Sequence, residues 1–355
     1  MPKPVDAHLR HSQFFIEKLR DSDDQYIKGG NNVYEGLKLF DYDWENIRRG
    51  FEWATENIAT NRIAAELCNV YADIGSFCLE LRLQPNELIH WQEAGIEASK
   101  MLDDSVAESL HYGNLGLAYF ASEAYIKALE CFNHQILLSQ QNRSIDIDFL
   151  GIANLGNLYS ALGEFEKGIQ YQNKALTYFR SQNAWQYEAA ILGNLGNAYL
   201  ESGITYPLDS SWRNLENKLY EQISFHAVII ESKFSFSQNI KPDSIEIALS
   251  NYKMCLEIAQ RIGDYRLEGT ALGSIGAAYY LLGDINISLD YIQRGISVLS
   301  TIGFGKGIVV LYEILGLAQQ KNNNLQAALE SHLEQLSLAR DVNDSRSENA
   351  ALFHI

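Results

Sequence analysis

Five asparagines at regular spacing are the residues whose chemistry is most informative. Asn114, Asn154 and Asn194 lie 40 residues apart, and Asn157 and Asn197 follow the last two by three residues. An asparagine amide offers two hydrogen-bond donors and an acceptor, so a column of them can bind the backbone of an extended peptide. Alternatively, the amides bond to local carbonyls or to one another and hold the structure together. We favour ligand contact, because asparagine is a mediocre helix former and its repeated use within a helix has a cost.

Apolar and aromatic residues accompany the asparagines and would form the walls of such a site. Besides the asparagines, the predicted binding residues are Leu117, Phe120, Leu150, Tyr187, Ala190, Leu200, Glu201 and Tyr280. The predicted partner is a protein or peptide segment of neutral to basic charge, because the chain has a formal net charge of −17. The same acidic balance argues against nucleic acid and against anionic membrane surfaces as partners.

No other group of residues indicates catalysis, a cofactor or a metal. Gly303-Phe-Gly-Lys-Gly307 is too short for a phosphate-binding loop, follows no strand and is interpreted as a loop between repeats. His8 and His11 share a helical face without a third metal ligand nearby. We therefore predict a protein that is not an enzyme and has neither cofactor nor metal. An enzyme subunit that uses the irregular region 204–242, with Asp209, His226 and Glu231 as candidates, is a rival interpretation.

The elements that must position the asparagines follow from a ladder of glycines. The ladder consists of Gly116, Gly156, Gly196, Gly276 and Gly316, at multiples of 40 residues. A second ladder in the same phase (Gly163, Gly203, Gly283 and Asn323) marks left-handed helix ends. Between the two ladders, apolar residues recur at helical spacing, for example over 148–162 and 164–180. Each period therefore predicts two antiparallel helices joined by a tight turn, with the first glycine at their crossing.

The repeated phrase resembles the tetratricopeptide repeat: Leu-Gly, tyrosine three residues later, alanine twelve later and an aromatic four beyond that. The usual period is about 34 residues, and a period of 40 looks like the kinesin-light-chain type. The resemblance covers residues 104–341 and implies an all-α, right-handed superhelical solenoid of about six antiparallel helix pairs. It also implies that the first helix of each pair lines a concave groove, which would recognise a partner segment without catalysis.

One glycine of the ladder is missing, at position 236. The favoured interpretation is a degenerate unit at 204–243, because Ala248, Tyr252 and Cys255 keep the phase of the repeat. The alternative is a helical insertion, roughly 204–242, between the two helices of the third repeat. Both interpretations predict a helix over 211–236.

The ends of the chain carry no clean repeat. We predict an N-terminal helical segment over 1–60, a degenerate first helix pair over 61–103 and a C-terminal cap over 342–355, with a short helix near 345–354. Residues 41–54 (DYDWENIRRGFEWA), with 10–15 and 91–98, resemble the segment that follows the nucleotide-binding core of STAND-type ATPases in bacterial regulators. No phosphate-binding loop is present, so the resemblance implies the sensor half without ATP hydrolysis.

A cytoplasmic location is expected from composition. No run of about 18 apolar residues occurs, and the N-terminus lacks the apolar stretch of a signal peptide. The four cysteines (Cys68, Cys78, Cys131 and Cys255) have no metal or redox spacing and are interpreted as buried residues of a reducing compartment. A sensor of a small ligand or peptide pheromone, derived from a STAND-type regulator, is the closest rival to a passive scaffold.

Overall fold

The computed structural model describes residues 4–204 and 241–355, and these residues are 87% helical. They form sixteen helices, and the described ranges contain no β-strand, so the all-α prediction is confirmed. The chain divides into an N-terminal unit, Met1–Ser181, and a C-terminal unit, Gln182–Ile355, which are described separately.

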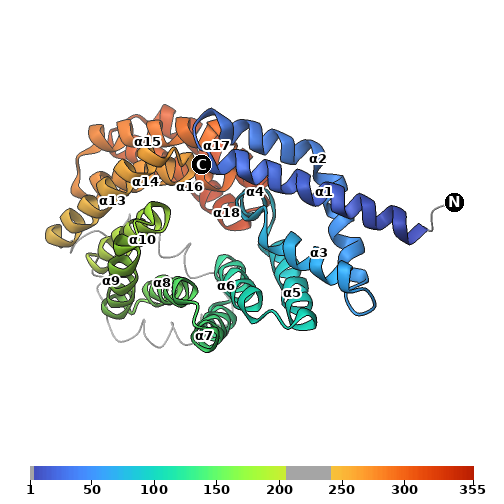
Figure 1. The fold of residues 1–355 in the computed structure, drawn as a ribbon. Helices are drawn as coiled ribbons and strands as arrows, with labels where there is room; N and C mark the ends of the chain where they lie inside the picture. Colours follow the sequence, from blue (N-terminus) through green and yellow to red (C-terminus); the bar gives the residue numbers. More distant parts are fainter. Residues whose placement is uncertain (1–3, 205–240) are drawn as a thin grey trace. The chain divides into compact units, whose positions relative to one another are not determined.

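Nine helices make up the described part of the N-terminal unit (Figure 1). They are α1 (Pro4–Ile27), α2 (Asn31–Glu56), α3 (Arg62–Asp73), α4 (Ser76–Arg82), α5 (Pro85–Leu102), α6 (Ser105–Ala121), α7 (Tyr125–Asn142), α8 (Ile145–Ala161) and α9 (Phe165–Ser181). Three antiparallel pairs, α3 with α5, α6 with α7 and α8 with α9, follow the hairpin of α1 and α2.

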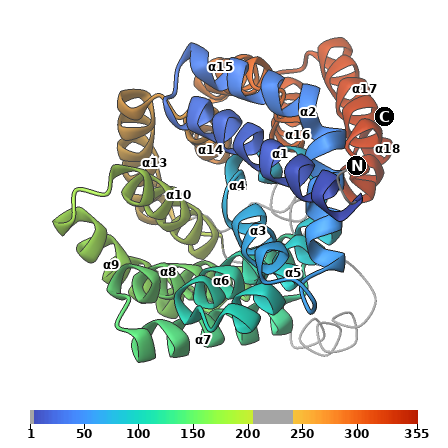
Figure 2. The same cartoon turned by 45° about the vertical axis from the view of Figure 1, so that its right-hand side comes forward.

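Seven described helices form the C-terminal unit (Figure 2). They are α10 (Trp185–Ser202), α13 (Pro242–Ile262), α14 (Tyr265–Leu282), α15 (Ile285–Thr301), α16 (Gly305–Lys321), α17 (Leu325–Asp341) and α18 (Ser345–His354). The pairs are α10 with α13, α14 with α15, and α16 with α17, and α18 packs on α17. The short C-terminal helix occurs where the sequence predicts it.

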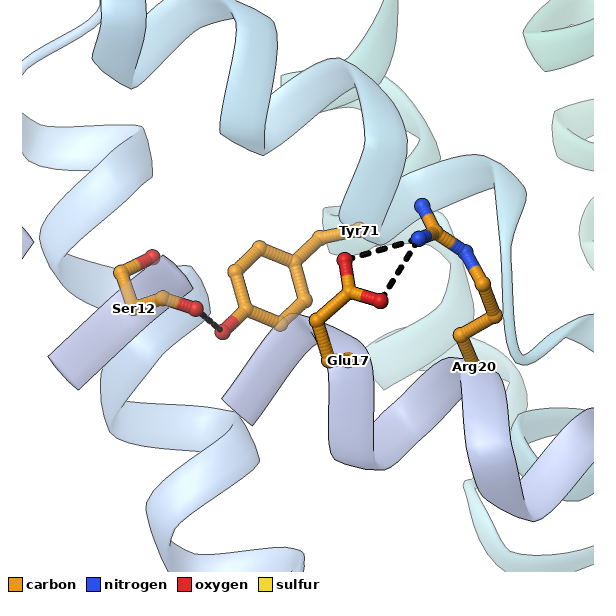
Figure 3. Close-up of polar contacts among 4 residues, drawn as sticks. All are labelled: Ser12, Glu17, Arg20 and Tyr71. Atoms are coloured by element: carbon orange, nitrogen blue, oxygen red, sulfur yellow. Dashed lines mark hydrogen bonds and ion pairs between the residues drawn. The ribbon is translucent and has the colours of Figure 1, made fainter. Parts of the chain in front are cut away.

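A buried tyrosine joins the first three helices. The hydroxyl of Tyr71 on α3 donates to the carbonyl oxygen of Ser12 on α1 at 2.8 Å (Figure 3). A Cβ atom at Gly50 on α2 would lie 2.3 Å from this hydroxyl, so only glycine lets α2 approach so closely. The Glu17–Arg20 pair on α1, also drawn in Figure 3, is exposed and therefore contributes little to stability.

The aromatic residues of the N-terminal phrase form a core. Trp91 on α5 stacks on Phe51 of α2, with ring centroids 3.9 Å apart and an interplanar angle of 12°. Trp44 lies 6.0 Å from Trp91 in a second stacked contact. Offset stacking of this kind stabilises beyond burial alone, by about 0.5–1.5 kcal/mol per pair. These residues therefore have a packing role in this chain.

The glycine ladder lies where the two helices of each pair cross, as predicted. A Cβ atom at Gly116 would lie 2.4 Å from the Phe132 ring, and one at Gly196 would lie 2.3 Å from the Tyr252 ring. The partners of Gly156, Gly276 and Gly316 are Gln172, Ile292 and His332, at 2.9, 2.5 and 2.4 Å. Each glycine thus accommodates one side chain from the second helix of its own pair.

Most of the predicted left-handed helix ends are confirmed, and one is wrong. Gly163, Gly283 and Asn323 have φ values of 79°, 89° and 57°. Gly203 instead has φ −78° and ψ −15°, which is right-handed. The physical reason is that α10 is not followed by a tight turn into the next described helix.

The packing of α13 corrects the favoured interpretation of the missing glycine. A degenerate unit at 204–243 would give α13 a partner within that unit, whereas α13 packs on α10, beside which it lies in both views (Figure 1 and Figure 2). This is the pairing that the insertion alternative predicts. The helix predicted over 211–236, together with Asp209, His226 and Glu231, lies outside the described residues.

Candidate functional site

The predicted site residues of α6 lie at one end of its length. Asn114 is half-buried, and Leu117 is 42% exposed. Phe120 is half-buried because it packs on the core formed by Ala128, Phe132, Leu155 and Leu158. Asn114 and Leu117 are therefore the residues of α6 best able to meet a partner.

The next first helix, α8, contacts α6 and carries three predicted residues. Leu150, Asn154 and Asn157 are all half-buried. The Nδ2 group of Asn154 donates to Oε1 of Gln135 on α7 at 3.5 Å, a long hydrogen bond between neighbouring helix pairs. The amide of Asn157 has no hydrogen-bond partner among the residues that the structure describes.

In the C-terminal unit, α10 carries a row of predicted residues. Tyr187 is 45% exposed, Ala190 and Asn194 are half-buried, and Asn197 is exposed. The Oδ1 atom of Asn197 accepts a hydrogen bond of 2.7 Å from the hydroxyl of Tyr252 on α13. Nothing in the described ranges bonds to the amide of Asn194.

The remaining predicted residues differ in their surroundings. Leu200 is half-buried and packs on a core cluster to which Tyr280 belongs. Tyr280 is only 7% exposed, and Lys321 lies over its ring at 4.8 Å, so we leave Tyr280 out of the site. Glu201 is half-buried. Burial raises the pKa of Tyr252 well above its ordinary value, and the charge of Glu201 adds to this effect.

The amides therefore fall into two groups. Asn154 and Asn197 bond to second helices, as the structural interpretation expects, whereas Asn114, Asn157 and Asn194 are unpartnered within the described structure. The partners Gln135 and Tyr252 are functional residues that sequence reasoning did not identify. Tyr252 could have been identified, because it lies one inserted period beyond the position sixteen residues after Gly196.

A buried histidine forms the other notable polar cluster of the N-terminal unit. His111 is fully buried, and its Nδ1 lies 3.0 Å from Oε1 of Gln92, which itself donates to the carbonyl of Ala72 at 2.8 Å. Its Nε2 lies 2.8 Å from the side-chain amide of Asn69. Burial lowers the pKa of His111 to about 4, so the ring is neutral at pH 7. The cluster ties α3, α5 and α6 together.

The described residues give no structural support to metal chemistry or to a membrane span. Among them, no three His, Cys, Asp or Glu side chains gather as metal ligands would, and no helix is both long and apolar enough to cross a bilayer. The four cysteines are free and buried.

Comparison with known proteins identifies the repeat. Residues 152–182 match the model of the tetratricopeptide repeat. Human G-protein-signaling modulator 1 is 25% identical over 227 residues, which are 61% of this chain and 30% of that protein. The chain thus spans about a third of the length of this relative.

Solved structures share the fold. A Rap protein complexed with competence and sporulation factor has a TM-score of 0.57 and 13% identity, covering 97% of this chain and 79% of that chain. The apo form of RapI also scores 0.57, at 12% identity, with 88% and 99% covered. A STAND protein with a tetratricopeptide-repeat sensor from Pyrococcus horikoshii scores 0.53 at 16% identity, with 97% and 48% covered.

Proposed function

We propose that this chain, a stack of helix pairs that carries a tetratricopeptide repeat, is a non-catalytic scaffold or sensor for a protein or peptide segment. The observation that carries the proposal is the set of unpartnered amides on first helices. Asn114 and Asn157 in the N-terminal unit, and Asn194 in the C-terminal unit, are half-buried without a described hydrogen-bond partner. Partly buried polar groups gain most when a ligand completes their hydrogen bonds.

The chemistry of the proposed site suits an extended backbone. Leu117 and Leu150 in one unit, and Tyr187, Ala190 and Leu200 in the other, offer apolar surface beside the amides. The net charge of −17 favours a neutral to basic partner and disfavours nucleic acid and anionic membranes. The proposal includes no catalytic step, no cofactor and a cytoplasmic location.

A sensor that changes conformation is the second candidate. It is favoured by the shared fold with the Rap protein that was solved in complex with competence and sporulation factor. A sensor predicts a smaller radius of gyration on binding, measured by small-angle X-ray scattering. A passive scaffold predicts no change.

The proposal is tested by comparing bonded with unbonded asparagines. The probe is a peptide recovered by the wild-type chain from a random decapeptide phage library. Asn114→Ala with Asn157→Ala should weaken its binding by roughly 10- to 100-fold, because each lost hydrogen bond costs about 1–2 kcal/mol. The melting temperature should change little, since neither amide has a partner in the described structure.

Asn154→Ala is the matched control for stability, because its amide bonds to Gln135. It should lower the melting temperature more than the double variant does. If the double variant melts several degrees lower and binds normally, the amides are structural and the proposed site is wrong. If the wild-type chain recovers no peptide, the proposal of peptide recognition fails.

A further inference from the structure

We propose that Tyr252 is a positioning residue that orients the amide of Asn197, so that this residue presents hydrogen-bond donors and selects a ligand group that accepts them. The ligand group would be a backbone carbonyl or a carboxylate. The inference rests on the proposed function, because it concerns one residue of the proposed binding surface.

The position of Tyr252 is held by packing. Its side chain is 1% exposed, and its ring occupies the space left by the absent side chain of Gly196. A ring fixed in this way places its hydroxyl at one point next to α10. From there it donates to Oδ1 of Asn197 at 2.7 Å. Tyr252 can therefore anchor the exposed amide at little further cost in side-chain entropy.

The hydrogen bond decides which end of the amide is available. A free asparagine can offer either its oxygen or its NH2 group to a ligand. With Oδ1 engaged by Tyr252, the NH2 group is left with no partner in the described parts of the chain, and Asn197 is exposed. Burial keeps the pKa of Tyr252 well above its ordinary value, with Glu201 adding to the effect. The phenol therefore remains protonated and continues to donate at neutral pH.

The other helix pairs show the same correspondence between the two positions. Phe132, which has no polar group, accompanies Leu117, and Ile292 accompanies Ala277. Gln172 and Tyr252, which carry polar groups, accompany Asn157 and Asn197. His332 beside Leu317 departs from the pattern. A polar second-helix residue at this position thus accompanies an asparagine on the first helix in four of the five pairs or is absent with it.

Asn197→Asp tests the orientation directly. Aspartate keeps an oxygen for Tyr252 and has no donor for a ligand. With the library-selected peptide as probe, Asn197→Asp should bind at least as weakly as Asn197→Ala, roughly 5- to 30-fold below wild type. Binding should be measured at about 1 M salt, where the Debye length is about 3 Å and the added charge is screened. Wild-type affinity in Asn197→Asp would overturn the inference, because it would mean that the amide presents its oxygen.

Tyr252→Phe tests whether the hydroxyl acts through Asn197. It should weaken binding about 3- to 10-fold in the wild-type background and have no further effect in Asn197→Ala. Tyr279→Phe is the control, because its hydroxyl accepts from Lys253 and bonds to no asparagine. Additive effects of Tyr252→Phe and Asn197→Ala would overturn the positioning role.

A measurement without ligand separates this inference from the proposed function. The Asn197 side-chain NH2 group should be ordered by ¹⁵N relaxation in the wild-type chain and mobile in Tyr252→Phe. An amide that is equally mobile in both proteins would overturn the inference even if peptides bind. Should Tyr252→Phe fail to fold, the relaxation of the wild-type amide and the Asn197→Asp titration decide the matter. If no peptide is recovered, the proposed function fails, and the relaxation experiment still tests the orientation.

Discussion

The backbone N–H of Lys241 donates to the carbonyl oxygen of Gly203 at 2.8 Å. The end of α10 and the start of α13 therefore meet directly, although residues 205–240 separate them in sequence. The crossing of Gly196 with Tyr252 lies in the same pair of helices. The third helix pair is thus complete in its described residues.

Replacement of residues 205–240 by a short Gly-Ser-Gly link should leave the fold intact. The flanking residues are already adjacent, and closing a shorter loop has a smaller entropic cost. Circular dichroism and thermal melting should show unchanged helicity per residue and a melting temperature within a few degrees of wild type. Deletion of 204–243 is the comparison, because it also removes Pro242 and Asp243 from the first turn of α13. If the replacement loses its cooperative melt, the two helices depend on the intervening residues.

Two glycines three residues apart on α10 should respond to alanine in opposite directions. Gly196→Ala forces a Cβ atom to within 2.3 Å of the buried Tyr252 ring and should destabilise by about 1–3 kcal/mol. Gly193→Ala meets only Cys255 Sγ at 3.7 Å and should stabilise by up to about 1 kcal/mol through helix propensity. Urea denaturation of both variants checks this, and equal effects would contradict the crossing.

The buried His111 should make stability fall as the pH drops. Burial lowers its folded pKa to about 4 from 6.5, so the unfolded chain binds a proton between these values and the folded chain does not. The resulting loss is on the order of 3 kcal/mol, and it is complete below about pH 4. It should appear as a difference in unfolding free energy between pH 7.5 and 4.5.

Comparison of two histidine variants isolates this effect. His111→Gln should be less stable than wild type at pH 7.5 and should show a smaller loss on acidification. His8→Gln changes an exposed histidine and should leave the pH dependence as it is in wild type. A steep acid loss that persists in His111→Gln would assign it to other groups.

The cysteines should be unreactive in the folded protein. Burial raises the pKa of Cys68 and of Cys255 to about 12 and that of Cys131 to about 11, and it raises the pKa of Cys78 as well. The reactive thiolate is therefore scarce at pH 8. Ellman's reagent should label no thiol rapidly until urea is added, whereas Ser297→Cys, at an exposed position of α15, should label at once. Rapid labelling of a native cysteine would show local opening.

The paired helices could be predicted because glycine marks a steric requirement. Gly116 and Gly276 have to be glycine where Phe132 and Ile292 fill the space, so the period is written in the residues themselves. The left-handed ends at Gly163 and Gly283 are likewise local properties of single residues. Such features need no knowledge of distant contacts.

The pairing of α13 could not be predicted because of a coincidence of length. From the start of α10 at Trp185 to the start of α14 at Tyr265 is 80 residues, two periods, although these residues contain one described pair. An insertion one period long leaves every later residue in phase. Periodicity alone therefore cannot distinguish it from a degenerate repeat.

The asparagines could be located in sequence but not assigned a role. Asn154 and Asn157 share a helix and a spacing, yet only Asn154 bonds to Gln135 of the preceding pair. Whether an amide has a partner depends on side chains from another helix, which a spacing on one helix does not reveal. Tyr280 shows the same limit, since its burial comes from packing between pairs.

Because every ladder glycine is matched to a residue of its own pair, genetic exchange between repeats should respect the pair as its unit. Gly116 accommodates Phe132 and Gly316 accommodates His332, side chains of different size and shape. A crossover in the turn within a pair would join a glycine to a foreign partner. A crossover in the connection between pairs, near Arg143 or Gly303, would move each matched couple intact. Shuffled versions of this chain should therefore fold only when whole helix pairs are exchanged.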